Sequence, residues 1–195
     1  MKRLIALLLA GMLLLAFAAC GEKEDANITE PETTLAGEEP TETTTGAPMQ
    51  SATLVAAFGP DEESRKTYEV PVADADNFGV GEIANALTEL TGISFALESA
   101  LPGGGMSLLM VDFSSESALV VGPPEPQKEE FHMFDRESLV LFMLDSLYFS
   151  IVENLPIFGD ERHGVYFTLN GEAISVEGLG ELPDEPYKGS GFWLG

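Results

Sequence analysis

An uncharged apolar run, Leu4 to Ala19, follows Lys2 and Arg3 and ends in small residues before Cys20. The run has 16 residues, fewer than the ~20 that a helix needs to cross a hydrocarbon core about 30 Å thick. A short basic segment, an apolar segment and small residues in this order form the pattern of a secretory signal peptide. We therefore expect residues 1–19 to be an export signal, so that the fold is built from later residues.

The cysteine at the end of this run predicts an anchor. Phe17-Ala18-Ala19-Cys20 resembles the bacterial lipobox, whose cysteine receives a diacylglyceryl group carrying fatty acids such as palmitate. Two acyl chains suffice for stable membrane attachment. Cys20 is the only cysteine of the chain, which excludes a disulfide and, once lipidated, thiol chemistry. The expected partner is the membrane, at the outer face of the cytoplasmic membrane. The alternatives are a signal peptide with a chance cysteine and a transmembrane helix.

Residues 20–50 differ in composition from what precedes and follows them. Among residues 21–50, eight are Asp or Glu, seven are Thr and three are Pro, with few aliphatic side chains. Such a segment buries too little apolar surface to offset its ordering entropy, so we expect a disordered linker.

The charge of the chain excludes one class of partner. The net charge of −24 becomes −26 without residues 1–19, because these include two basic residues and no acidic one. So acidic a surface repels phosphates, and we expect no nucleic-acid binding.

Residues 51–195 have the composition and length of one globular domain. Hydrophobic periodicity and turn residues predict its elements. Asn77 and Asp135 are the expected helix caps, Gly92 ends the first helix, and Asn170-Gly171 favours a type I′ turn. The predicted elements are strands at 53–58, 67–72, 93–97 and 106–113, a turn at 101–105, helices over about 79–91 and 136–154, and a hairpin of 164–169 with 172–176.

The predicted fold class is α+β, with a mostly antiparallel sheet packed against two helices on one face. The second helix is apolar nearly all round, interrupted by Asp145, so we expect it to lie in the core.

Residues capable of chemistry are scattered along this sequence. His132 and His163 have no metal-ligating neighbour at helical or hairpin spacing, and both are expected in loops. The adjacent carboxylates Glu129 and Glu130 lie in a charged loop and are expected to be solvated. No nucleophile elbow or Cys-His pair is present.

Two ligand-binding motifs are matched only in part. Asp74 to Gly79 begins like a calcium loop, but Phe78 and Asn85 occupy ligand positions. The glycines of residues 103–105 lack the Lys-Ser or Lys-Thr of a phosphate loop. We therefore expect no catalytic residue, metal or cofactor, and no enzymatic activity.

Three stretches in order carry a family resemblance: Val111-Asp112-Phe113-Ser114-Ser115, Ser150 to Leu155, and Val165 to Ile174. Together with the helix at 79–91 and the turn from Leu101, they resemble the GerMN domain of GerM-like lipoproteins. The resemblance covers roughly residues 54–178. It implies a non-enzymatic domain, similar to ring-building modules, with a role in spore formation or germination.

The resemblance also implies other envelope proteins or further copies of this chain as partners. Small domains tethered to one membrane gain local concentration, so weak lateral contacts suffice. The candidate contact surfaces are the edge at strands 53–58 and 67–72 and the loop 118–135. The alternative is an envelope lipoprotein that binds a peptide, a glycan or a cell-wall fragment through Tyr187, Phe192 and Trp193. A tail that folds back onto the core is the competing explanation of these rings.

Overall fold

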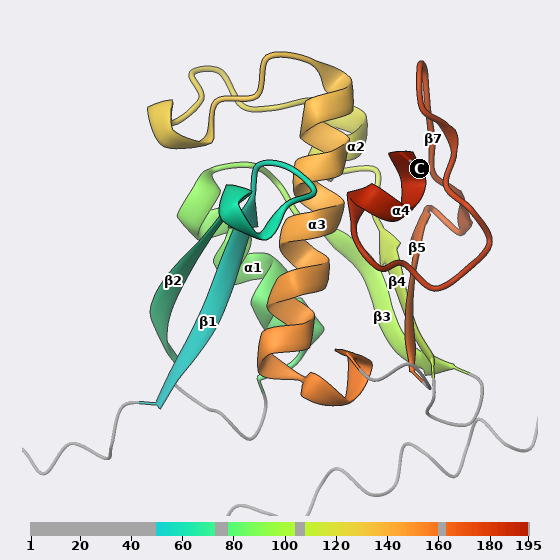
Figure 1. Cartoon of the computed structure of the whole chain (residues 1–195). Coiled ribbons are helices and arrows are strands. Elements are labelled where there is room, and N and C mark those ends of the chain that lie inside the picture. Colours follow the sequence, from blue (N-terminus) through green and yellow to red (C-terminus); the bar gives the residue numbers. More distant parts are fainter. Residues whose placement is uncertain (1–49, 73–77, 104–107, 160–162, 195) are drawn as a thin grey trace, which may run out of the picture. The chain divides into compact units, whose positions relative to one another are not determined.

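The computed structural model describes residues 50–72, 78–103, 108–159 and 163–194 (Figure 1). The chain divides into two units, Met1–Thr44 and Thr45–Gly195, and every described residue belongs to the second. The predicted signal peptide, Cys20 and the acidic linker therefore lie outside the described residues. So do Asn77, the first carboxylates of the calcium-like loop, and Gly104 with Gly105.

The first element is the predicted hairpin. β1 (Gln50–Ala57) pairs antiparallel with β2 (Arg65–Val72) from Gln50 opposite Val72 to Ala57 opposite Arg65. A short 3-10 helix, η1 (Glu62–Ser64), forms the turn between them. Pro71 lies near the end of β2, opposite Ser51, where a missing N–H interrupts little of the ladder.

The first predicted helix is α1 (Val80–Thr91), whose buried face includes Ile83 and Leu87. Its N-cap is Gly79 and not Asn77, and the N–H of Gly79 donates to Glu82 Oε2 at 3.0 Å. Gly92 ends the helix as predicted, at φ 79°, a left-handed conformation that glycine adopts without steric cost.

A four-stranded sheet follows in the order β3-β4-β5-β6, formed by β3 (Leu97–Gly103), β4 (Leu108–Phe113), β5 (Gly164–Leu169) and β6 (Glu172–Ala173). β4 and β5 are parallel, whereas the other neighbours are antiparallel. The strand predicted at 93–97 is wrong, because β3 begins at Leu97. The turn predicted from Leu101 is also wrong, because residues 101–103 pair with β4.

The Asn-Gly turn between β5 and β6 is confirmed, since Asn170 and Gly171 both have positive φ, 51° and 76°. The returning strand is shorter than predicted. It breaks at the buried Ile174, whose carbonyl accepts from the N–H of Leu182 at 2.8 Å. Beyond it, β7 (Ser175–Val176) pairs with β8 (Gly180–Glu181) in a separate small ladder.

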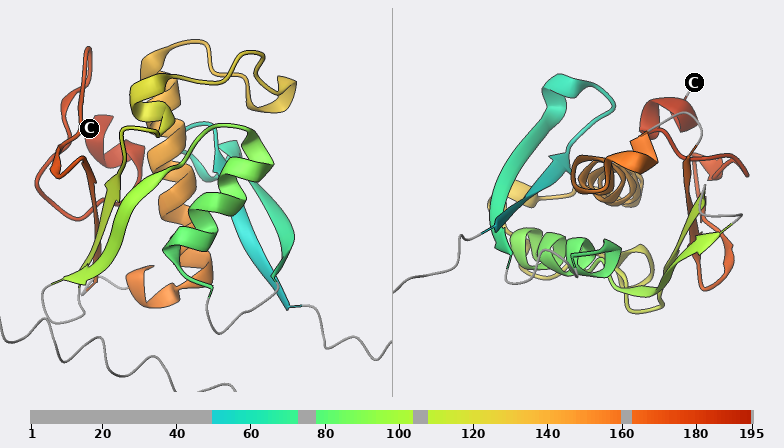
Figure 2. Two further views of the ribbon diagram at one scale, coloured as in Figure 1. Left: turned by 180° about the vertical axis from the view of Figure 1, so that it is seen from behind. Right: turned by 90° about the horizontal axis from the view of Figure 1, so that it is seen from below.

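The second predicted helix is confirmed with the predicted bounds, as α3 (Arg136–Asn154), and Asp135 caps it through the N–H of Ser138 at 2.7 Å. It lies with α1 between the β1–β2 hairpin and the four-stranded sheet (Figure 2). The α+β class is confirmed, but the helices separate two sheets where one sheet was expected. None of the helices in the described ranges combines the length and the apolarity that crossing a bilayer requires.

Three polar residues of α3 contact β1 along its edge. Ser146, Ser150 and Asn154 accept from the N–H groups of Ala57, Val55 and Thr53 at 3.0, 2.8 and 3.1 Å. Asn154 Nδ2 also donates to Thr53 O at 2.7 Å. Four helical residues rise about 6 Å, close to the roughly 6.7 Å of two strand residues, so the register holds over two steps and three contacts. α3 therefore occupies the edge of β1 as a neighbouring strand would.

The remaining elements are short. They are α2 (Ala118–Val121), the 3-10 helices η3 (Glu129–Phe131) and η4 (Pro156–Gly159), and α4 (Ser190–Leu194).

Candidate interaction surface

The loop between α2 and α3 is held by side chains that bond to the backbone. Gln127 donates through Nε2 to Met133 O at 3.0 Å and accepts the N–H of Met133 through Oε1 at 2.7 Å. Lys128 Nζ donates to the carbonyls of Glu89 and Leu90 at 2.8 and 2.7 Å, at the C-terminus of α1. A cation is favourable there because of the helix dipole. The loop is thus closed on itself and fixed to α1.

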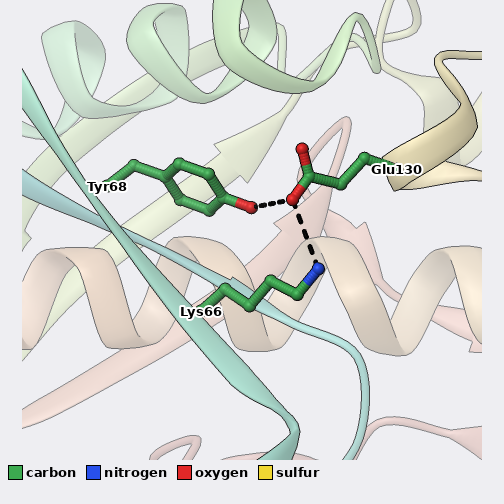
Figure 3. Close-up of polar contacts among 3 residues, drawn as sticks. All are labelled: Lys66, Tyr68 and Glu130. Atoms are coloured by element: carbon green, nitrogen blue, oxygen red, sulfur yellow. Dashed lines mark hydrogen bonds and ion pairs between the residues drawn. The ribbon is translucent and has the colours of Figure 1, made fainter.

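A polar cluster ties η3 to β2 (Figure 3). Tyr68 and Lys66, two residues apart on β2, converge on Glu130 Oε1 at 2.6 and 3.2 Å. Their bonds lower the pKa of Glu130, the Tyr68 hydroxyl contributing most. Burial, followed by the bond to Glu130, raises the pKa of Tyr68 to about 12. We call Lys66, Tyr68 and Glu130 the exposed cluster.

Aromatic rings pack beneath η3. Phe131 is buried and stacks on Phe58 with ring centroids 6.1 Å apart and planes within 9°. Its ring also lies 6.0 Å from Tyr68 and 6.4 Å from Phe142. Offset and tilted pairs at these separations are favourable beyond the area they bury. The loop is therefore anchored in the core by Phe131.

Phe134 is three residues further on, and 88% of it is exposed. Its two neighbours are fixed, because Met133 is bonded to Gln127 and Asp135 caps α3. The backbone at Phe134 is therefore held in place, and the side chain is exposed from an ordered segment. Burying a phenylalanine side chain contributes roughly 1.5–3 kcal/mol, which this side chain leaves unused.

Two hollows adjoin Phe134. The larger, of about 360 Å³, lies between the β1–β2 turn, the loop, α3 and α4, and its lining includes Phe58, Phe134, Leu141 and Ser190. The smaller, of about 190 Å³, includes Pro123, Met133 and Phe134. Val120 and Val121, 45% and 65% exposed, directly precede its lining. We define the Phe134 patch as the exposed or half-buried Phe58, Val120, Val121, Phe134 and Leu141, together with Met133, which is buried.

The wall of the larger hollow at Ser190 is held by a second, buried polar cluster. Asp145 Oδ1 accepts the hydroxyl of Tyr187 and the N–H of Ser190, both at 2.7 Å, and Oδ2 accepts the Ser190 hydroxyl at 2.5 Å. Burial raises the pKa of Asp145, against the lowering effect of the Ser190 and Tyr187 bonds. Burial, then the negative charge of Asp145, raises the pKa of Tyr187. We call Asp145, Tyr187 and Ser190 the buried cluster.

The chain approaches this cluster through Gly189 at φ 106°, where a side chain would be strained. A Cβ there would also lie 3.2 Å from Cζ of Phe149, so the close approach of the tail to α3 needs glycine.

The other functional predictions have mixed outcomes. His132 and His163 lie outside helices and strands, as expected. Glu129 and Glu130 are both exposed, as expected, and Glu130 is in addition bonded to Lys66 and Tyr68. Within the described parts of the chain, no three His, Cys, Asp or Glu side chains gather as a metal site would require.

The candidate contact surfaces are only partly available. The edge of β1 is occupied by α3, so that part of the prediction is wrong, whereas in the described part of the chain β2 has β1 as its only strand neighbour. Loop 118–135 carries most of the Phe134 patch.

The C-terminal aromatic residues are largely used by the fold. Tyr187 is buried, and Trp193 packs against the core. The side chain of Phe192 is outside what the structure describes.

The three stretches that resemble the GerMN domain hold the scaffold together. Asp112 Oδ1 accepts the Thr168 hydroxyl at 2.8 Å and the N–H of Gly171 at 2.9 Å, which joins the first stretch to the third. Ser150 and Asn154, in the second, occupy the edge of β1. No family model, curated protein or solved structure matches this chain. The resemblance therefore stays a prediction.

Proposed function

We propose that this chain is a lipoprotein, anchored through Cys20 outside the cytoplasmic membrane, whose domain is a non-enzymatic interaction module. The observation that carries the proposal is the Phe134 patch. Exposed apolar patches on well-ordered surfaces are typical of protein-protein contact sites. Phe134 also has the properties of an interface anchor, because it is aromatic, exposed and held by a fixed backbone.

The arrangement of the domain suits a tethered module. Gln50, at which the described chain begins, and Phe58 lie at opposite ends of β1 (Figure 1). The point at which the linker joins the domain is thus separated from the patch by the length of a strand. The resemblance to the GerMN domain supports a role in spore formation or germination.

The alternative is an envelope lipoprotein that binds a small ligand. A volume of about 360 Å³ is at the lower end of the 300–1,000 Å³ that is typical of ligand pockets. Burial of Tyr187 and packing of Trp193 weaken the case for stacking of sugars on the tail.

Complementation of a deletion strain tests the proposal. Four versions are compared: the native chain, Cys20→Ala, Phe134→Ala and the control Leu101→Ala, which removes an exposed apolar side chain from β3. We expect Cys20→Ala to lose palmitate labelling and the membrane fraction. Both Cys20→Ala and Phe134→Ala should lower the yield of heat-resistant spores, and Leu101→Ala should not. Normal spore counts for Phe134→Ala in a strain whose deletion loses spores would reject the patch as the working surface.

A further inference from the structure

Acidic side chains accompany the Phe134 patch on three elements. They lie in the turn before β2, on η3, and around the first turn of α3. Asp135 lines the smaller hollow, and each of the others is within three residues along the chain of a residue that lines one of the two hollows. All are exposed: Asp61, Glu62, Glu63, Glu129, Glu130, Asp135 and Glu137.

Four lysine and arginine side chains of the same region contact the chain's own groups, whereas Lys188, two residues before Ser190 of the larger hollow, is exposed. Lys66 pairs with Glu130, the single salt bridge within the described ranges. Lys128 donates to the end of α1, and Arg136 Nη2 donates to Leu119 O at 2.7 Å. The Arg65 guanidinium lies 3.5 Å from the centre of the Phe149 ring. The rim of the patch therefore presents more negative than positive charge to a partner.

An apolar surface with an acidic rim selects among occupants. A second copy of this chain, with a net charge of −26 without residues 1–19, is repelled, as are anionic lipids and nucleic acids. An amphipathic peptide that carries apolar side chains on one face and Lys or Arg beside them satisfies both parts of the surface. Two hollows that share Phe134 in their linings suit two apolar side chains of such a peptide.

We infer that the Phe134 patch binds a basic amphipathic peptide segment of a partner protein. The inference rests on the proposed function and names its class of partner. Phe134 supplies the apolar anchor, while the acidic rim attracts and orients the segment.

Fluorescence anisotropy with a labelled model peptide tests the inference. The peptide has about 18 residues, Leu and Lys at helical spacing, which is long enough to form a helix when bound. The protein is the chain from residue 20 onward carrying Cys20→Ala, which keeps every described residue. We expect Phe134→Ala to weaken binding about tenfold or more, as truncation of an anchor does. The control Leu101→Ala should stay within about twofold, because no anchor is removed.

The role of charge is tested separately. Glu63→Gln with Glu129→Gln should weaken binding several-fold and flatten its dependence on salt, since fewer charges attract the peptide. The matched control is Glu98→Gln with Glu172→Gln, which removes two exposed acids from the four-stranded sheet. Circular dichroism and urea midpoints confirm that each variant is folded.

Three results would overturn the inference. They are equal binding by the native chain and Phe134→Ala, equal binding of a scrambled peptide of the same composition, and equal binding of a peptide with Glu in place of Lys. The second would mean that bulk charge alone attracts the peptide. Loss of binding to phosphatidylcholine vesicles in Phe134→Ala, with unchanged peptide binding, would assign the patch to lipid.

The two proposals fail in different ways. If the peptide does not bind but Phe134→Ala still loses spores, the patch works through another class of partner. If peptide binding depends on Phe134 and spore yield does not, the proposed function fails and the binding surface stands.

Discussion

The two polar clusters, one between η3 and β2 and the other between the C-terminal segment and α3, are built in opposite ways. The exposed cluster ties η3 to β2 through one carboxylate oxygen of Glu130, at the surface. The buried cluster ties the C-terminal segment to α3 through both oxygens of Asp145, which is 1% exposed. The pKa of Glu130 is lowered, whereas that of Asp145 is raised.

The difference shows what a carboxylate contributes in each setting. At the surface, the charge of Glu130 is stabilised by Tyr68 and Lys66, but water and salt compete for the same bonds. In the interior, the bonds to Asp145 have no competing water, and the cost of burying its charge exceeds what they recover. The bond between η3 and β2 is therefore local and weak, whereas the bonds between the C-terminal segment and α3 are part of the global fold.

The largest expected effect comes from Asp145→Ala. The variant leaves the hydroxyl of Tyr187 and the N–H of Ser190 buried without an acceptor, at a cost of about 3 kcal/mol in the free energy of unfolding. Urea denaturation measures it. Asp145→Asn is the matched control, because its amide can donate to the Ser190 hydroxyl while its oxygen accepts the other two bonds. We expect that variant to equal or exceed the native chain at pH 7, and an Asn variant as unstable as Ala would contradict the account.

A smaller loss is expected for Tyr187→Phe. The ring stays packed against Tyr148 and Phe167, and only the hydroxyl bond to Asp145 disappears. A hydrogen bond to a charged group contributes about 1.5 kcal/mol or more, which sets the expected shift of the urea midpoint. Tyr166→Phe on β5 is the control, and equal shifts for the two would remove the special role of the buried hydroxyl.

Stability should depend on pH with opposite sign in the two clusters. Because the folded-state pKa of Asp145 is raised above 3.8, folding takes up a proton between the two values. Relative to Asp145→Asn, the native chain therefore loses stability as pH rises from about 3.8 through the folded-state pKa of Asp145. The pKa of Glu130 is lowered below 4.5, so its contribution is present above 4.5 and lost as pH falls through the folded-state value. Urea denaturation from pH 3 to pH 7 measures the free energy of unfolding of the native chain, Asp145→Asn and Glu130→Gln. The difference between the native chain and each variant, plotted against pH, checks the sign expected for each cluster.

The smallest global effect is expected for Glu130→Gln at neutral pH. The urea midpoint should hardly change, because Phe131 still anchors η3 in the core. Amide exchange of residues 128–133 should become faster, and added salt should have the same effect on the native chain. If neither the Glu130→Gln substitution nor added salt changes the exchange rate, the exposed cluster does not hold the loop.

The sequence predicted elements whose signals are local. Asp135 and an apolar run give α3 its bounds, and Asn170-Gly171 gives the turn before β6. β3 was misplaced because it contains Pro102 and Gly103, which pair with β4 through tertiary contacts that override their local preference. In the sequence, Asp145 stands out as the charged residue that interrupts the apolar run of α3. Its partners could not be predicted, because Tyr187 and Ser190 lie 42 and 45 residues away. Nothing in the local sequence distinguishes Phe131, which is buried, from Phe134, which is exposed.

The edge of β1 closed by Ser146, Ser150 and Asn154 has a consequence for how copies of this chain can aggregate. A two-stranded ladder with two free edges can lengthen from both sides, and each added strand offers a fresh template to the next. Here one side is terminated by a helix, so a strand that joins β2 leaves no second site on this hairpin. If that strand is β2 of a second copy, the outer strands of the combined ladder are both β1, and α3 closes each of them. Growth through the hairpins then ends after one pairing, so α3 limits strand addition besides forming part of the core.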